Sequence, residues 1–171
     1  MTVHETVPCA DERIRTFGLL LEAHTRLTQL LDAELQRSDG VSLQTFEVLL
    51  RISRAPDGVI TMTDLAGQVA LSTGGVTRLA DRLSDIGLVE RRSCPEDRRR
   101  VHLALTPRGV EVLSRAIVSH VDALGLHVSG RIDPDDLEVF ERVLDTLRTG
   151  SDDAADDSDT ADDSASERGR G

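Results

Sequence analysis

The chain has 171 residues and a mass of 18.6 kDa, which is enough for one globular domain with a hydrophobic core and too little for two full-size domains. Its hydrophobic fraction of 39% and charged fraction of 30% are ordinary for a soluble protein. No apolar run approaches the roughly 18 residues that span a bilayer, and the acidic, polar stretch over residues 1–10 lacks the pattern of a signal peptide. We therefore expect a cytoplasmic protein with a flexible N-terminus over residues 1–10 and no membrane partner.

The net charge of −11 is unevenly distributed along the chain. Residues 151–171 hold eight acidic residues against two arginines, a net charge of −6, and no large apolar residue. Residues 91–108 hold six arginines against two acids, a local charge of +4. We expect a disordered acidic tail over 151–171 and a basic patch inside an otherwise acidic protein.

The first periodic segment, from Asp11 to Arg37, predicts one long helix. At about 1.5 Å per residue it would be roughly 40 Å long, which is too long to pack only against its own small domain. Asp39-Gly40 ends this helix, and Ser42 can cap a second one that ends before Ala55-Pro56-Asp57-Gly58. The apolar residues that carry the two patterns are Ile14, Phe17, Leu20, Leu21, Leu27, Leu30, Leu31 and Leu35 in the first helix, and Leu43, Phe46, Leu49 and Leu50 in the second.

Two short helices with a tight joint follow, which is the pattern of a helix-turn-helix. Thr61 and Asp64 form a capping box for the first, and Ser72 can cap the second after a break near residues 70–71. The predicted buried residues are Leu65, Ala66 and Val69 in the first helix and Val76, Leu79, Ala80, Leu83 and Ile86 in the second. The opposite face of the second helix is either a recognition surface for base edges or an ordinary solvated face, and it carries Thr73, Gly74, Thr77, Arg78, Asp81 and Arg82.

A β-hairpin is predicted directly after this helix. Its strands are residues 88–92 and the alternating Val101, Leu103 and Leu105, joined by a polar loop that contains Pro95. A hairpin so rich in cations can straddle a phosphate backbone and reach into a minor groove, which favours the DNA-binding interpretation. The arginines on its flanks and tip are Arg91, Arg92, Arg98, Arg99 and Arg100.

Two further apolar helices complete the pattern. Thr106-Pro107 opens a helix that runs to Gly130, and Asp133-Pro134 opens the last one. Their apolar stripes are Val110, Leu113, Ile117, Val121 and Leu124, and Leu137, Phe140, Leu144 and Leu147. Helices 11–37 and 107–149 would bury these stripes best against a second copy, in a symmetric homodimer. We predict a mainly α fold with a small β-hairpin: a winged helix-turn-helix domain at about 42–106 plus a helical dimerisation domain, together spanning 11–150.

The ordered series of motifs resembles the MarR family of winged helix-turn-helix transcription regulators, over roughly Ile14 to Leu147. The strongest stretches are LSTGGVTRL at 71–79, GLVER at 87–91 and PEDRR at 95–99. The resemblance implies a homodimer that binds a near-palindromic site in double-stranded DNA, as a ligand-responsive repressor. The positions that would contact DNA are Ser72, Thr73, Thr77 and Arg78 in the recognition helix and Arg98 and Arg99 in the wing, with Asp97 orienting Arg99.

The resemblance also implies a small-molecule ligand in a crevice between the two domains. His24 and His120 lie on the apolar stripes of the framing helices, where they line that crevice or are satisfied core histidines. Family members that sense oxidants surround a cysteine with tyrosines, but this chain has no tyrosine. Cys9 is therefore either a sensor or inert, and Cys94 could disturb the wing if it were modified.

Neither a metal site nor a catalytic site is predicted. His120 and His127 are about 10 Å apart along the helix, too far to share one ion, and we expect no cofactor. The chain has no glycine-rich phosphate loop, no activated nucleophile and no paired carboxylates outside the tail, so we do not expect an enzyme. The alternative function is a winged-helix module that binds protein, which the overall −11 favours and the local +4 disfavours. The tail serves either solubility or competition with DNA for the wing.

Overall fold

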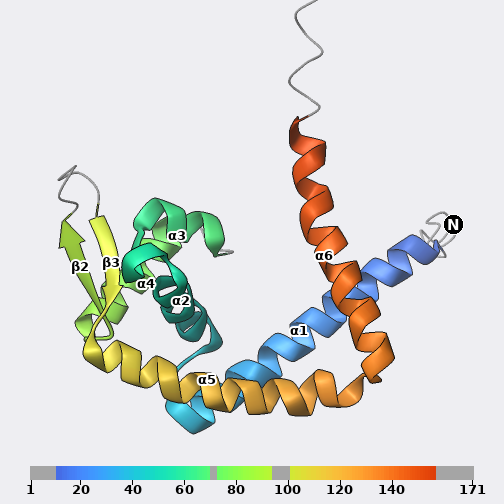
Figure 1. The fold of residues 1–171 in the computed structure, drawn as a ribbon, viewed down its shortest axis with the longest axis horizontal. Coiled ribbons are helices and arrows are strands. Elements are labelled where there is room, and N and C mark those ends of the chain that lie inside the picture. Colours follow the sequence, from blue (N-terminus) through green and yellow to red (C-terminus); the bar gives the residue numbers. More distant parts are fainter. Residues whose placement is uncertain (1–10, 70–72, 94–100, 157–171) are drawn as a thin grey trace, which may run out of the picture. The chain divides into compact units, whose positions relative to one another are not determined.

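The computed structural model describes residues 11–69, 73–93 and 101–156 of the chain (Figure 1). The chain divides into two compact units, Met1–His127 and Val128–Gly171. The first unit contains α1 (Glu12–Asp39), α2 (Leu43–Arg54), β1 (Val59–Thr61), α3 (Met62–Gln68), α4 (Thr73–Asp85), β2 (Val89–Ser93), β3 (Val101–Leu105) and α5 (Pro107–His127). The second contains a short 3-10 turn (Ser129–Arg131) and α6 (Pro134–Asp156). This confirms the predicted class, mainly α with a small antiparallel sheet.

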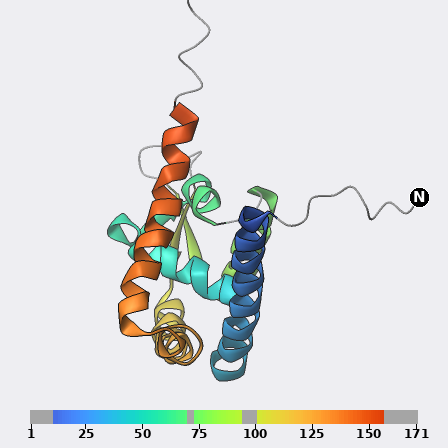
Figure 2. The same ribbon diagram turned by 90° about the vertical axis from the view of Figure 1, so that its right-hand side faces the viewer.

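Helix α1 begins and ends where its capping residues predict. The Asp11 carboxylate accepts a hydrogen bond from the Arg13 amide (2.9 Å), and Gly40 ends the helix in the left-handed conformation (φ 69°). Figure 2 shows α1 as a single continuous rod. Only its C-terminal half is buried in the first unit, at Leu31 and Leu35. Its N-terminal half leaves a row of large apolar side chains exposed, namely Ile14, Phe17, Leu19, Leu20 and Leu21.

The three strands form one antiparallel sheet in the order β1-β3-β2. The hairpin β2–β3 is the predicted one, with Val89 opposite Leu105 and Ser93 opposite Val101. Strand β1 was not predicted, because three residues are too few to show an alternating pattern. It follows a turn over Pro56–Gly58, and Ile60 pairs with Leu103 in the middle of the sheet.

The hydrophobic core lies among the C-terminal end of α1, helices α2, α3 and α4, the sheet and the first half of α5. In Figure 1 these elements gather around the start of α5. The prediction that Ile86 belongs to this core is wrong, because Ile86 is 46% exposed. The reason is that α4 ends at Asp85 and the chain reverses at Gly87 (φ 72°), so Ile86 no longer follows the helical period. The fully buried large side chains are Leu35, Leu49, Ile52, Leu65, Leu83, Leu103, Val48 and Val76.

Helix α5 differs from its prediction in its end and in its buried face. It stops at His127, not at Gly130, and a 3-10 turn follows. The face that packs in the first unit consists of Gly109, Val112, Leu113, Ala116 and Ala123. These mostly small residues allow close packing against α1 and α2. The predicted stripe therefore turns largely outward, leaving Val110, Ile117 and Val121 exposed.

Helix α6 forms the second unit. The Asp133 carboxylate accepts a hydrogen bond from the Asp135 amide (3.1 Å) at the start of the helix. The helix continues past Gly150 to Asp156, into the segment expected to be a disordered tail. Residues 157–171 lie outside the described part of the chain. Along α6 the large apolar side chains are exposed, namely Val139, Phe140, Val143, Leu144 and Leu147.

Candidate nucleic-acid interface

Helix α4 is held by its apolar face and presents a polar face to solvent. Val76, Leu79, Ala80 and Leu83 are buried in the core, as the period of the sequence predicts. Helix α3 packs against α4, and the predicted cap at its start is present: Thr61 Oγ1 accepts from the Asp64 amide (3.0 Å). The two helices thus pack together as the predicted helix-turn-helix requires, and the joint at residues 70–72 lies outside the described residues.

The solvent-facing side of α4 carries the small and cationic residues singled out in the sequence. Thr77, Arg78 and Arg82 are exposed, and Thr73 is the first residue of the helix. Ser72, the proposed capping and contact residue, lies outside the described residues. A short hydroxyl side chain and two guanidinium groups on one helix face can reach base edges and backbone phosphates. The other exposed residues of this face are Gly74 and Asp81, and exposed Asp85 is the last residue of the helix, beyond this face.

The hairpin projects beyond the core next to α4. Val89 is buried, but the following residues of β2 are exposed on both faces of the strand, including Arg91 and Arg92. Residues 94–100 lie outside the described part of the chain, so the predictions for Cys94, Asp97, Arg98 and Arg99 are not tested. The same holds for Cys9.

Two of the arginines in the predicted basic patch are neutralised by acidic neighbours. Arg91 Nη2 donates to Asp81 Oδ1 of α4 at 2.5 Å. Arg92 donates to Glu90 Oε1 through Nε (2.8 Å) and Nη2 (2.5 Å). Counting charges along the sequence missed the first pair, because Asp81 lies ten residues before Arg91 and only the fold brings them together. The closeness of Glu90 to Arg92 in the sequence was the available signal for the second ion pair.

A hydrogen-bonded joint connects the winged segment, which comprises α2 to β3 (Leu43–Leu105), to α5. Thr106 Oγ1 donates to the Gly87 carbonyl (2.7 Å) and accepts from the Gly109 amide (3.0 Å), which is the predicted helix cap. The Thr106 amide donates to the Leu88 carbonyl (3.1 Å). Because the same threonine binds the turn after α4 and the start of α5, the direction of α5 relative to α4 is fixed.

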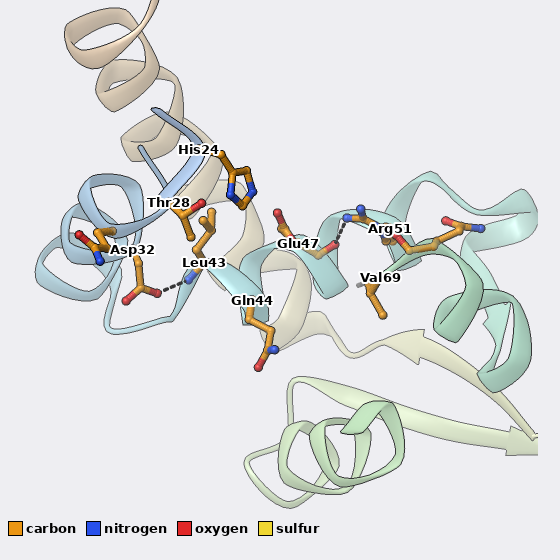
Figure 3. A pocket seen from close by; sticks show the side chains of 10 residues that line it. His24, Thr28, Asp32, Leu43, Gln44, Glu47, Arg51 and Val69 are labelled. Atoms are coloured by element: carbon orange, nitrogen blue, oxygen red, sulfur yellow. Dashed lines mark hydrogen bonds between the residues drawn. The ribbon is translucent and has the colours of Figure 1, made fainter. Parts of the chain in front are cut away.

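A cavity of about 530 Å³ lies between α1 and α2. Figure 3 shows its walls, in which two contacts order the polar groups. Asp32 Oδ1 accepts from the Leu43 amide (2.7 Å), and Arg51 Nε donates to the Gln68 carbonyl (2.8 Å) at the end of α3. Eight of the ten lining residues are polar or charged, so the cavity offers hydrogen-bonding groups to a ligand as well as apolar contact. The lining residues are His24, Thr28, Gln29, Asp32, Leu43, Gln44, Glu47, Arg51, Gln68 and Val69.

The two histidines proposed for the crevice have different surroundings. His24 lines the cavity, and its ring is labelled in Figure 3. His120 lies instead against Phe46, with 4.5 Å between the ring centroids, and is not among the lining residues. Burial lowers the pKa of His120, and the negative charge of Glu47 opposes that shift. His120 is therefore favoured in its neutral form as part of the α2–α5 packing.

The described residues also bear on metal and membrane partners. No cluster of three or more His, Cys, Asp or Glu residues is arranged to hold a metal ion in residues 11–69, 73–93 and 101–156. Across the same ranges, every helix is too short or too polar to span a bilayer.

Comparison with known proteins links this architecture to one family. A family model described as "MarR family" matches residues 39–100, which run from the last residue of α1 to the residue before β3. The chain is 31% identical over 81 residues to the transcriptional repressor MprA of Escherichia coli, and the match covers 47% of this chain and 46% of MprA. This chain thus spans about half the length of that curated relative. It is 29% identical over 134 residues to the multiple antibiotic resistance protein MarR of Salmonella typhimurium, covering 78% of this chain and 91% of that protein.

Solved structures give longer matches. Sco3205, a MarR family transcriptional regulator from Streptomyces coelicolor in complex with DNA, matches with a TM-score of 0.75 and 29% identity. That match covers 82% of this chain and 89% of Sco3205. A mutant of E. coli MarR, complexed with operator DNA, matches with a TM-score of 0.71 and 26% identity, over 80% of this chain and 95% of that one.

Proposed function

This chain belongs to the MarR family, and from that premise we propose that it is a transcription regulator that binds double-stranded DNA sequence-specifically. The observation that carries the proposal is the exposed face of α4, where Thr77, Arg78 and Arg82 stand clear of the core beside an arginine-bearing hairpin. A recognition helix needs small and hydrogen-bonding side chains at the face that enters the major groove. Two similar proteins, Sco3205 and a mutant of E. coli MarR, were solved in complex with DNA, which supports DNA as the partner.

Specific roles follow from the positions that match the family pattern. Thr77 and Arg78, together with Ser72 and Thr73 at the start of α4, read base edges in the major groove. Arg98 and Arg99 of the wing enter the adjacent minor groove, where the negative potential attracts a guanidinium group. Asp97 orients Arg99.

The regulator acts as a homodimer. The outward face of α5 with Val110, Ile117 and Val121, and the N-terminal half of α1, carry large apolar side chains that water would otherwise contact. Helix α6 carries a similar apolar row, including Phe140 and Leu144. A two-fold symmetric dimer presents two copies of α4, so the operator is near-palindromic, with half-sites about one helical turn apart.

The regulator is a ligand-responsive repressor. The cavity between α1 and α2 touches both a framing helix and, through Arg51 and Gln68, the end of α3. A small molecule that fills it binds the two domains in one arrangement and shifts the equilibrium between DNA-competent and incompetent states. The polar side chains that line the cavity, including His24, Asp32 and Glu47, favour a ligand with several hydrogen-bonding groups. Repression is the activity named for the relative MprA. We place the protein in the cytoplasm and assign it no catalytic activity.

The experiment that tests this proposal is selection of duplexes from a random-sequence library, with the full-length protein as bait. We expect enrichment of a near-palindromic sequence, bound by a particle that sediments as a dimer. Selection that enriches no sequence, with a dimer that is folded, would contradict DNA recognition and favour the protein-binding alternative.

A further inference from the structure

An acidic residue stands in the middle of the proposed recognition face. Asp81 is exposed on α4, and its carboxylate Oδ1 accepts from Arg91 Nη2 of β2 at 2.5 Å. The side chains of Arg91 and Asp81 are 42% and 52% exposed, so the pair lies at the surface between the helix and the hairpin. A carboxylate at this place repels DNA phosphates, and its presence therefore calls for an explanation.

Fold stability does not explain the pair. Exposed ion pairs contribute little to the free energy of unfolding, because water screens them and two long side chains lose freedom. The helix and the strand are already joined without it: Leu83, Leu88 and Val89 are buried together, and the Leu88 amide donates to the Leu83 carbonyl (2.9 Å). The pair must therefore matter for something other than holding α4 to β2.

Arginine geometry indicates what that role is. A guanidinium group has five N–H donors in a rigid planar fork, and Asp81 engages only Nη2 of Arg91. Among the described residues no other hydrogen bond engages the Arg91 side chain, so its Nε and Nη1 donors can reach a backbone phosphate at the edge of the groove that α4 enters. A phosphate contact made by a side chain of fixed direction sets the register of a protein on its duplex.

We propose that Asp81 is a positioning residue, which holds Arg91 in the direction that meets one backbone phosphate when α4 is seated on its own site. This inference rests on the proposed DNA-binding function. On random DNA the seating of α4 is loose, and a freely moving Arg91 would bind phosphates equally well. The pair therefore sharpens the preference for the correct site and lowers the general affinity for DNA.

The test compares two duplexes: the sequence enriched by the wild-type protein from a random library, and a shuffled duplex of the same composition. Asp81→Asn removes the hydrogen-bonded anion and keeps every cation. We expect tighter binding to shuffled DNA, and a ratio of affinities for enriched over shuffled DNA that falls about twofold at each site, or about fourfold per dimer. The dependence of affinity on salt is retained, since Arg91 still reaches phosphates.

Asp85→Asn is the matched control. Asp85 is exposed one turn further along α4, so its replacement changes the charge of the helix equally and leaves the Asp81–Arg91 pair intact. We expect it to raise affinity for both duplexes alike, with an unchanged ratio. An equal fall in the ratio for Asp85→Asn would overturn the proposal, because charge alone would then account for the effect.

A double variant isolates the action through Arg91. Arg91→Gln should lower affinity and flatten the salt dependence by about one log–log unit for each phosphate that the protein no longer neutralises. In that background, Asp81→Asn should not lower the ratio further. A further fall there, or an unchanged ratio in Asp81→Asn alone, would overturn the positioning role while wild-type site preference stands. A wild-type protein that prefers no duplex would overturn the proposed function and this inference with it.

Discussion

Gly109, near the start of α5, is the position where the smallest addition should do the most damage. A Cβ built there would lie 2.0 Å from the Leu88 carbonyl oxygen and 3.0 Å from its carbon. Both are backbone atoms, so no side-chain rotation relieves the overlap. The same carbonyl accepts from the Thr106 amide (3.1 Å), and therefore any shift of Leu88 also disturbs the joint between the winged segment and α5.

The change in unfolding free energy follows from one stabilising and two destabilising contributions. Alanine is favoured over glycine in a helix interior by about 1 kcal/mol. Forcing an extra carbon into a packed site costs about 1–3 kcal/mol, and weakening the hydrogen bond to Leu88 costs about 1 kcal/mol more. We therefore expect Gly109→Ala to lower the free energy of unfolding by about 2 kcal/mol.

The assay is urea denaturation followed by circular dichroism, at one fixed protein concentration because the stability of the proposed dimer depends on it. Gly125→Ala is the matched control: it lies on the same helix, and nothing is within 4 Å of its added Cβ. This control should be as stable as wild type or up to about 1 kcal/mol more stable. If Gly109→Ala behaved like Gly125→Ala, the close approach of α5 to Leu88 would be wrong.

Three further predictions concern the cap of α3, the titration of His120 and the apolar face of α5. Thr61→Ala should lower the free energy of unfolding by about 1 kcal/mol in urea denaturation, since it removes the cap on the Asp64 amide, whereas exposed Thr63→Ala should be nearly neutral. The pKa of His120 lies below its ordinary 6.5, so the unfolded state binds the proton more readily and stability falls as pH drops below about 6.5. His120→Gln should therefore reduce the loss of unfolding free energy between pH 7 and pH 5. The reduction should be smaller than the upper limit of about 1.4 kcal/mol per pH unit, because His120 is only partly buried. An unchanged pH profile of stability in this variant would argue against a lowered pKa of His120. Val121→Glu places a charge on the exposed apolar face of α5 and should give a folded monomer in sedimentation at micromolar concentration, and a persistent dimer would place the interface elsewhere.

The features that the sequence predicted well are local ones. Gly40, Ser42, Thr61 and Thr106 all end or begin helices through contacts that reach at most four residues along the chain. Their residue types therefore indicate the boundary without knowledge of the rest of the fold. The buried face of α4 was also predictable, because its apolar residues occupy only one side of the helix.

The features that escaped prediction depend on distant parts of the chain. Strand β1 exists because Ile60 pairs with Leu103, more than forty positions away in sequence. Helix α5 is apolar on two faces, and only its packing against α1 decides that Ala116 is buried while Val121 is exposed. The same holds for the candidate site: its helix face was readable from the sequence, but the pairing of Asp81 with Arg91 arises only when α4 and β2 meet.

The central claim is that the exposed face of α4 recognises a DNA sequence, and Arg78→Ala tests it most directly. The quantity to measure is the ratio of affinities for the enriched duplex over shuffled DNA, at about physiological salt. Because a base contact contributes about 1–3 kcal/mol, the ratio for Arg78→Ala should fall at least about fivefold. Arg115→Ala, which removes the same charge from exposed α5, should leave the ratio unchanged. A wild-type ratio in Arg78→Ala, or an equal fall in Arg115→Ala, would contradict recognition by this face.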